Sequence, residues 1–107
     1  MTEFKNVSVQ KKSNIYYDGN VTSTKIIFED GSIKRLGIIQ PGEYEFNSKG
    51  KEIMEILFGE LEVMLPGSAG WQTINTEKAF EVPASSKFML KVHEVTNYCR
   101  SYIEQTT

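Results

Sequence analysis

Residues 41–63 read PGEYEFNSKGKEIMEILFGELEV, and this stretch decides the fold. A Pro-Gly pair opens a first short strand, a second strand starts at Glu52, and Gly59 ends it with a turn into a third. Alternation places Glu52 and every second residue as far as Phe58 on one face of the second strand, yet both faces are largely apolar. A strand that is apolar on both sides is expected in the centre of a sheet.

Short segments rich in β-branched and aromatic residues, separated by Gly, Pro and Asp-Gly breaks, make up the rest of the chain. Asp30-Gly31 lies between two apolar runs, which predicts a hairpin because that turn needs positive φ. Further strands are predicted over residues 15–17, 21–28, 33–39, 61–65, 71–74, 79–83, 88–92 and 98–103. About nine or ten short strands without a helix predict an all-β fold, a double-sheet jelly roll that wraps to limit its exposed edges.

The size and charge of the chain narrow its class. With 107 residues it fits one domain over residues 1–107, in which the weakly patterned residues 1–13 form an N-terminal arm. Its 39% hydrophobic and 24% charged content is ordinary for a globular protein. A net charge of −2 gives no reason to expect nucleic acid or an anionic membrane as a partner.

Cysteine and histidine are scarce in this chain. Cys99 and His93 are the only residues of their types, which argues against an intrachain disulfide and against a metal site built from several His or Cys ligands. No apolar run approaches the roughly 18 residues of a spanning helix, and the N-terminus lacks the apolar core of a signal peptide. We therefore expect a cytoplasmic protein, with Cys99 as a small buried hydrophobe and His93 on the surface.

The order and spacing of several short motifs resemble a known family. These motifs are Gly42-Glu43-Tyr44-x-Phe46, Glu52, Gly59-x-Leu61-x-Val63-x-Leu65, Trp71-Gln72, Phe80-x-Val82-Pro83-x-x-Ser86-x-Phe88 and Val92-x-Glu94. They cover about residues 14–103 and are similar to those of the pyrimidine/purine nucleoside phosphorylases, small proteins of the cupin type. The resemblance implies a homodimeric cupin barrel that cleaves ribonucleosides with inorganic phosphate as co-substrate, giving free base and ribose 1-phosphate.

The comparison with cupins also predicts that no metal is bound. Metal-binding cupins carry His-x-His, then a Glu, then a Gly seven positions after that Glu, and a further His in a second motif. Counting along this chain places Glu52 at the Glu position, residues 46–48 at the first His positions and Phe88 at the last. Only Glu52 remains as a possible ligand, and a lone carboxylate does not hold a transition metal.

Glu52 is the candidate catalytic residue. The cupin comparison directs its face of the strand inward, where a buried carboxylate with a raised pKa can protonate the departing base or stabilise the sugar cation. A structural carboxylate, bonded to the backbone or to a basic partner, is the alternative.

Arg100, Arg35 and Ser86 are the candidate phosphate ligands. The last strand of the family usually reads Tyr-x-Cys-x-aromatic, and here Arg100 takes the Cys place, which alternation directs inward with Tyr98 and Tyr102 unless a bulge shifts the register. An inward Arg can bind phosphate with two parallel hydrogen bonds, or it can pair with Glu52 or turn out to solvent. Arg35 can instead belong to a solvated edge strand, and Ser86 can make local turn bonds.

Four aromatic residues are the candidate contacts for the nucleoside: Tyr44, Phe46, Phe88 and Tyr98. Stacking suits broad base tolerance, since every nucleobase has a π-face, but aromatic residues in such strands also serve simply as core.

Together with these residues, the resemblance implies a metal-independent nucleoside phosphorylase, which is a glycosyltransferase of the pentosyl type. One alternative is a non-catalytic cupin that binds a nucleoside or a sugar and needs no phosphate site. Another is a metal-dependent cupin oxygenase or isomerase. Release of base in phosphate separates the first alternative from the enzyme, and the metal content of the protein tests the second.

Overall fold

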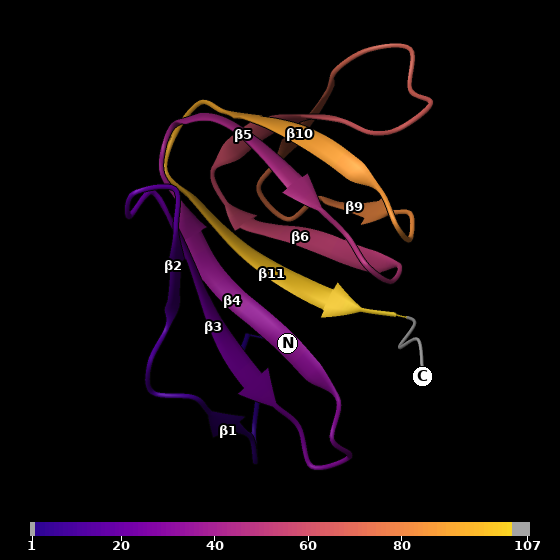
Figure 1. The fold of residues 1–107 in the computed structure, drawn as a ribbon. Coiled ribbons are helices and arrows are strands. Elements are labelled where there is room, and N and C mark those ends of the chain that lie inside the picture. The colour runs from indigo at the N-terminus through magenta and orange to yellow at the C-terminus, as the bar shows by residue number, and fades with distance from the viewer. Residues whose placement is uncertain (1, 104–107) are drawn as a thin grey trace.

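The computed structural model describes residues 2–103, in which eleven strands form two antiparallel sheets (Figure 1). The strands are β1 (Ser8–Val9), β2 (Asn14–Tyr16), β3 (Val21–Ile27), β4 (Ile33–Ile39), β5 (Gly42–Asn47), β6 (Glu52–Phe58), β7 (Glu60–Met64), β8 (Gln72–Asn75), β9 (Ala79–Val82), β10 (Lys87–Val92) and β11 (Thr96–Tyr102). Among these residues there is no helix of the length and apolarity needed to cross a membrane. The all-β prediction is confirmed.

The two sheets differ in size and lie face to face. The larger has the order β1-β3-β4-β11-β6-β9, with β2 added beside β3, and the smaller has the order β5-β10-β7-β8. In Figure 1, β5 and β10 cross over one half of the larger sheet, whereas the far ends of β3 and β4 extend beyond them. The predicted central strand is confirmed, because β6 pairs with β11 on one side and with β9 on the other.

The predicted hairpin joins β3 and β4. Gly31 has a φ of +86°, and its amide donates to the Phe28 carbonyl at 2.9 Å. The Asp30 carboxylate accepts from the Ser32 amide at 2.8 Å. Residues 29–31 therefore form a three-residue hairpin loop between Phe28 and Ser32. Only the glycine of the Asp-Gly pair has positive φ, so the loop is a β-turn that ends in a left-handed glycine, which is the commonest form of such a loop.

The N-terminal residues pair with the larger sheet. Ser8–Val9 forms β1 against one end of β3, and Asn14–Tyr16 forms β2 against the other end. Part of the predicted arm is therefore edge structure, and a two-residue strand is too short to show any periodicity in the sequence.

Apolar side chains from both sheets fill one part of the space between them. Ile39, Ile56, Leu61, Phe88 and Leu90 have no exposed surface. Gly59, at the turn from β6 to β7, has a φ of +108°, and an added Cβ would lie 2.7 Å from the Thr96 backbone. Phe58, predicted on the inner face, is instead 50% exposed because the strand ends at this turn.

Candidate functional site

A cavity of about 760 Å³ opens between the other part of the larger sheet and β5. Its floor is the inner face of β3, β4 and β11, and its rim consists of Tyr16 and Tyr17, β5, and the connection from β5 to β6. This volume lies within the range of about 300–1,000 Å³ that is usual for sites that bind small molecules.

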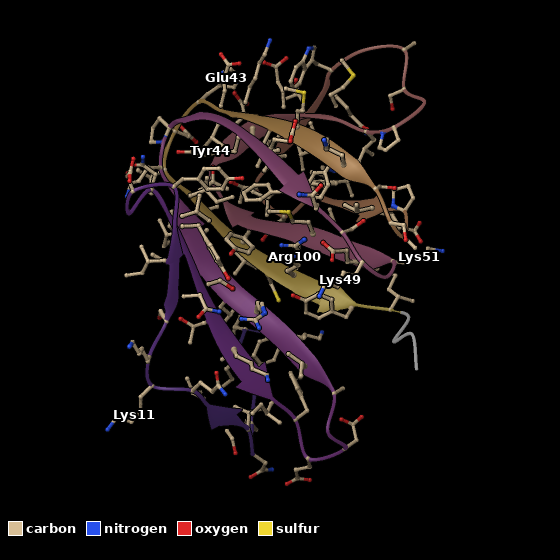
Figure 2. The ribbon with its side chains drawn as sticks, in the orientation of Figure 1. Lys11, Glu43, Tyr44, Lys49, Lys51 and Arg100 are labelled. Carbon is tan, nitrogen blue, oxygen red and sulfur yellow. The ribbon has the colours of Figure 1, made fainter. Side chains whose placement is uncertain are left out.

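Arg100 faces this cavity. The register shift between β11 and β6 falls between Asn97 and Tyr98, so the alternation of side chains is regular from Tyr98 onward. Tyr98, Arg100 and Tyr102 therefore lie on the same face of β11 and line the floor of the cavity. Figure 2 shows Arg100 between β11 and β5, with Lys49 on the nearby β5–β6 connection. Cys99 lies on the other face of β11, only 2% exposed, and burial raises the pKa of its thiol, which fits the inert role expected of it.

Arg100 and Glu52 form an ion pair at the edge of the cavity. The Arg100 Nε donates to Glu52 Oε1, and a terminal nitrogen of the same guanidinium donates to the Asn47 carbonyl at 3.2 Å. The Glu52 side chain is 2% exposed and that of Arg100 is 19% exposed. Burial raises the pKa of the Glu52 carboxyl, and the Arg100 guanidinium offsets this increase only in part.

Three basic residues lie directly opposite one another across the floor. Lys25 on β3 pairs in register with Arg35 on β4, and Arg35 pairs with Arg100 on β11. We call Lys25, Arg35 and Arg100 the basic row. Like charges on adjacent strands repel each other, so the row lowers stability unless an anion lies over it.

Among the side chains of residues 2–103, one carboxylate is bonded to the basic row. The Arg35 guanidinium donates to the buried Ser23 hydroxyl at 3.4 Å, and Arg100 is bonded to Glu52. Within residues 2–103, neither Lys25 nor Lys49 has an acidic partner within ion-pair distance. The cavity therefore has cationic groups available for a ligand.

Lys25 and Lys49 are not among the residues predicted from the motifs, although the sequence carries a signal for Lys25. The Asp-Gly turn fixes the pairing of the hairpin, and counting outward from it places Lys25 opposite Arg35. Lys34, beside Arg35, lies on the opposite face, where its ammonium is 5.5 Å from the centre of the Phe4 ring.

Of the four aromatic residues predicted to contact the nucleoside, two line the cavity and two belong to the core. Phe46 and Tyr98 line the cavity, although the Tyr98 hydroxyl is already bonded to the Thr22 carbonyl at 2.8 Å. Tyr44 and Phe88 do not line it, because Tyr44 is 7% exposed and Phe88 is fully buried in the core. For these two residues, the alternative of a core role is correct.

Tyr16 at the end of β2 and Tyr17 in the turn that follows add aromatic surface at the rim, and the motifs mark neither residue. The Tyr17 ring makes edge-to-face contacts with Tyr44 at 5.2 Å and with Phe46 at 5.7 Å between ring centres. The exposed end of the aromatic cluster is therefore formed by Tyr17 and Phe46.

Ser86 lies away from the cavity. Its amide donates to the Ser48 hydroxyl at 3.0 Å, and its own hydroxyl donates to the Ala84 carbonyl at 3.0 Å. The predicted phosphate contact is not supported, because the residue makes the local turn bonds that were the alternative.

The positions that hold a metal in other cupins do not fit one here. Phe88 is buried among apolar side chains, Phe46 offers no donor atom, and the Glu52 carboxylate is bound by Arg100. In the part of the chain that the structure describes, no three His, Cys, Asp or Glu side chains are grouped to hold a metal ion.

A cupin-type barrel with a basic cavity agrees with the family that the motifs suggest. The family model for pyrimidine/purine nucleoside phosphorylases matches residues 11–102. The chain belongs to this family. A pyrimidine/purine nucleoside phosphorylase of Syntrophotalea carbinolica is 54% identical over 97% of this chain and 100% of its own length.

Solved structures agree with the fold of this family. A protein of unknown function from Acinetobacter sp. ADP1 superimposes with a TM-score of 0.91, at 35% identity, over 94% of this chain and 98% of that chain. The EutQ protein of Clostridium difficile superimposes with a TM-score of 0.65 at 14% identity, over 77% of this chain and 67% of that chain. EutQ is similar in fold alone, and the cupin-type prediction is confirmed.

Proposed function

We propose that this protein is a metal-independent nucleoside phosphorylase, which transfers the ribosyl group of purine and pyrimidine ribonucleosides to inorganic phosphate. The observation that carries the proposal is the basic row, since three cations aligned across adjacent strands beside one carboxylate favour an anionic ligand. The names of the relatives supply the reaction class.

The charge of the cavity agrees with one phosphate and one neutral nucleoside. Of the residues that the structure describes, four with basic side chains and two with carboxylates line the cavity, which leaves an excess of two positive charges. A single hydrogen phosphate dianion balances that excess, whereas a nucleotide together with phosphate would exceed it. We therefore expect nucleosides rather than nucleotides as substrates.

In the proposed reaction, the bond from C1′ of the ribose to the base nitrogen breaks and a phosphate oxygen bonds to C1′. The electron pair of the broken bond leaves with the base, which takes up a proton, and the products are free base and ribose 1-phosphate. The sugar becomes cationic in the transition state, and an ionised Glu52 carboxylate stabilises that charge. Arg100 orients Glu52 through its Nε and binds the Asn47 carbonyl through one terminal nitrogen, and its other terminal nitrogen is the donor for phosphate.

The direct test is incubation of the protein with uridine or inosine, with and without phosphate, and measurement of base and ribose 1-phosphate. We expect base to appear only with phosphate, in equal amount to the sugar phosphate. Binding of nucleoside without any base release would indicate the non-catalytic alternative, and release without phosphate would indicate a hydrolase.

Metal independence has its own test. Treatment with a chelator, followed by metal analysis of the protein, should leave the phosphorolysis rate unchanged and find no stoichiometric metal. A rate that is lost with the chelator and restored by iron, manganese or zinc would overturn this part of the proposal.

Lys25 allows a test of the basic row with a control variant that removes the same charge from the other face of the sheet. Lys25→Met should raise the KM for phosphate by roughly three- to tenfold, because it removes one charged hydrogen-bond donor near the anion. Lys34→Met is the control, since Lys34 lies on the opposite face of the same sheet. If the two variants had the same KM for phosphate, the anion would not lie over the basic row.

A further inference from the structure

The cavity has a second polar wall, made of backbone rather than side chains. Among the strands of the described residues, β5 pairs only with β10 and is therefore an edge strand of the smaller sheet. The Ser48 amide donates to the Ser86 carbonyl at 2.8 Å, which continues the β5–β10 ladder and shows that even-numbered residues face β10. The N–H and C=O groups of Glu45 and Asn47 therefore point the other way, toward the cavity.

Side chains from the larger sheet already bind both of these carbonyls. The Tyr17 hydroxyl donates to the Glu45 carbonyl, and Arg100 donates to the Asn47 carbonyl. The two amides of the same residues have no hydrogen-bond acceptor within residues 2–103. At Glu45, the β5 edge thus has a free N–H donor beside a carbonyl acceptor that is occupied by the Tyr17 hydroxyl.

The position of Tyr17 would allow its hydroxyl to release the Glu45 carbonyl. It is 45% exposed, and it begins a turn in which Tyr17, Asp18 and Gly19 have φ values of 53°, 55° and 91°. Tyrosine and aspartate are strained in this region, and such residues persist where contacts such as the Glu45 bond hold them.

We propose that the Glu45 backbone on the β5 edge binds the hydrogen-bonding edge of the nucleobase, and that the Tyr17 hydroxyl gives up the Glu45 carbonyl when the base enters. This inference rests on the proposed function and assigns the base-binding element of the same cavity. Adjacent donor and acceptor groups occur on uracil, cytosine, adenine and hypoxanthine, so one backbone N–H and C=O pair binds all four. Recognition by backbone then permits both purines and pyrimidines.

Adenosine and purine riboside test the inference. They share the ring and the sugar, but purine riboside lacks the 6-amino group that would donate to the Glu45 carbonyl. Their dissociation constants are measured without phosphate, so the result does not depend on catalysis. In the unaltered protein, adenosine should bind more tightly than purine riboside.

Tyr17→Phe removes the competing hydroxyl and keeps the ring. We expect adenosine to bind roughly three- to tenfold more tightly, by the net value of one hydrogen bond, and purine riboside to bind as before. Tyr16→Phe is the matched control, because the Tyr16 hydroxyl has no bond to any described residue, and the ratio of the two affinities should stay unchanged.

A second readout follows the backbone itself. Adenosine should slow hydrogen exchange at the Glu45 amide, which is free in the unliganded chain, much more than at the Phe46 amide, which faces β10. Equal effects of Tyr17→Phe on both ligands, or no protection at Glu45, would overturn the inference. Binding as expected without any phosphorolysis would leave the inference standing and refute only the proposed reaction.

Discussion

The space between the two sheets has two parts, a closed apolar core and an open cavity, and the same strands contribute side chains to both. β6 contributes Ile56 to the closed part and Glu52 to the cavity, and β11 carries Tyr98 and Arg100 toward the cavity. The closed part is lined by buried apolar side chains, whereas the cavity contains like charges that repel each other. The closed part therefore stabilises the fold, whereas the like charges that make the cavity a binding site lower the stability of the protein.

The largest expected effect concerns the closed part. Phe88→Ala should lower the free energy of unfolding by about 3–5 kcal/mol, because it leaves a cavity in a fully buried position. Urea unfolding checks this value. Met89→Ala is the control on the outer face of the same strand, and it should change the free energy by less than about 0.5 kcal/mol. Equal losses in the two variants would contradict the distinction between the two faces.

In the cavity, Arg100→Gln should reduce kcat/KM by about 10²–10³-fold, comparable to the loss of one preorganised donor. It should also destabilise the protein, since Glu52 would remain buried without its partner. The double variant Glu52→Gln with Arg100→Gln separates the two effects. We expect it to regain stability in urea and to stay inactive, and a double variant with restored activity would remove both residues from the mechanism.

A smaller effect is the pH dependence that Glu52 gives to stability. Because burial raises the pKa of the folded carboxyl above its ordinary 4.5, the folded state holds this proton more tightly than the unfolded state. The resulting stabilisation is complete below pH 4.5 and is lost as pH rises through the folded pKa. In urea unfolding across this range, the unaltered protein should lose stability relative to Glu52→Gln. A relative gain would mean that Arg100 dominates over burial.

The smallest effect is expected at the surface. The His93 Nε2 donates a hydrogen bond to the Glu62 carboxylate at 2.7 Å, and the His93 side chain is 48% exposed. His93→Gln should change the free energy of unfolding by less than about 1 kcal/mol and leave phosphorolysis unchanged. A loss of activity would place a functional role outside the cavity.

The sequence predicts the fold better than the site, for physical reasons. Period-two alternation and the Asp-Gly turn report local geometry, so the central strand, the hairpin and the inward direction of Arg100 follow from them. Tyr17 and Lys49 reach the cavity from connections, which have no periodicity to reveal their direction. Tyr44 and Phe88 have the aromatic character of a binding surface, but only the packing of both sheets shows that no ligand reaches Phe88.

The short loop between β3 and β4 has a consequence for how this protein could be altered. Lys25 and Arg35 lie in register because the Glu29-Asp30-Gly31 loop has its present length. If one residue were removed there while the loop kept its geometry and β4 kept its pairing with β11, β3 would slip by one position, and Thr24 would replace Lys25 inside the cavity. The loop thus acts as a spacer that sets the charge of a binding site it never touches.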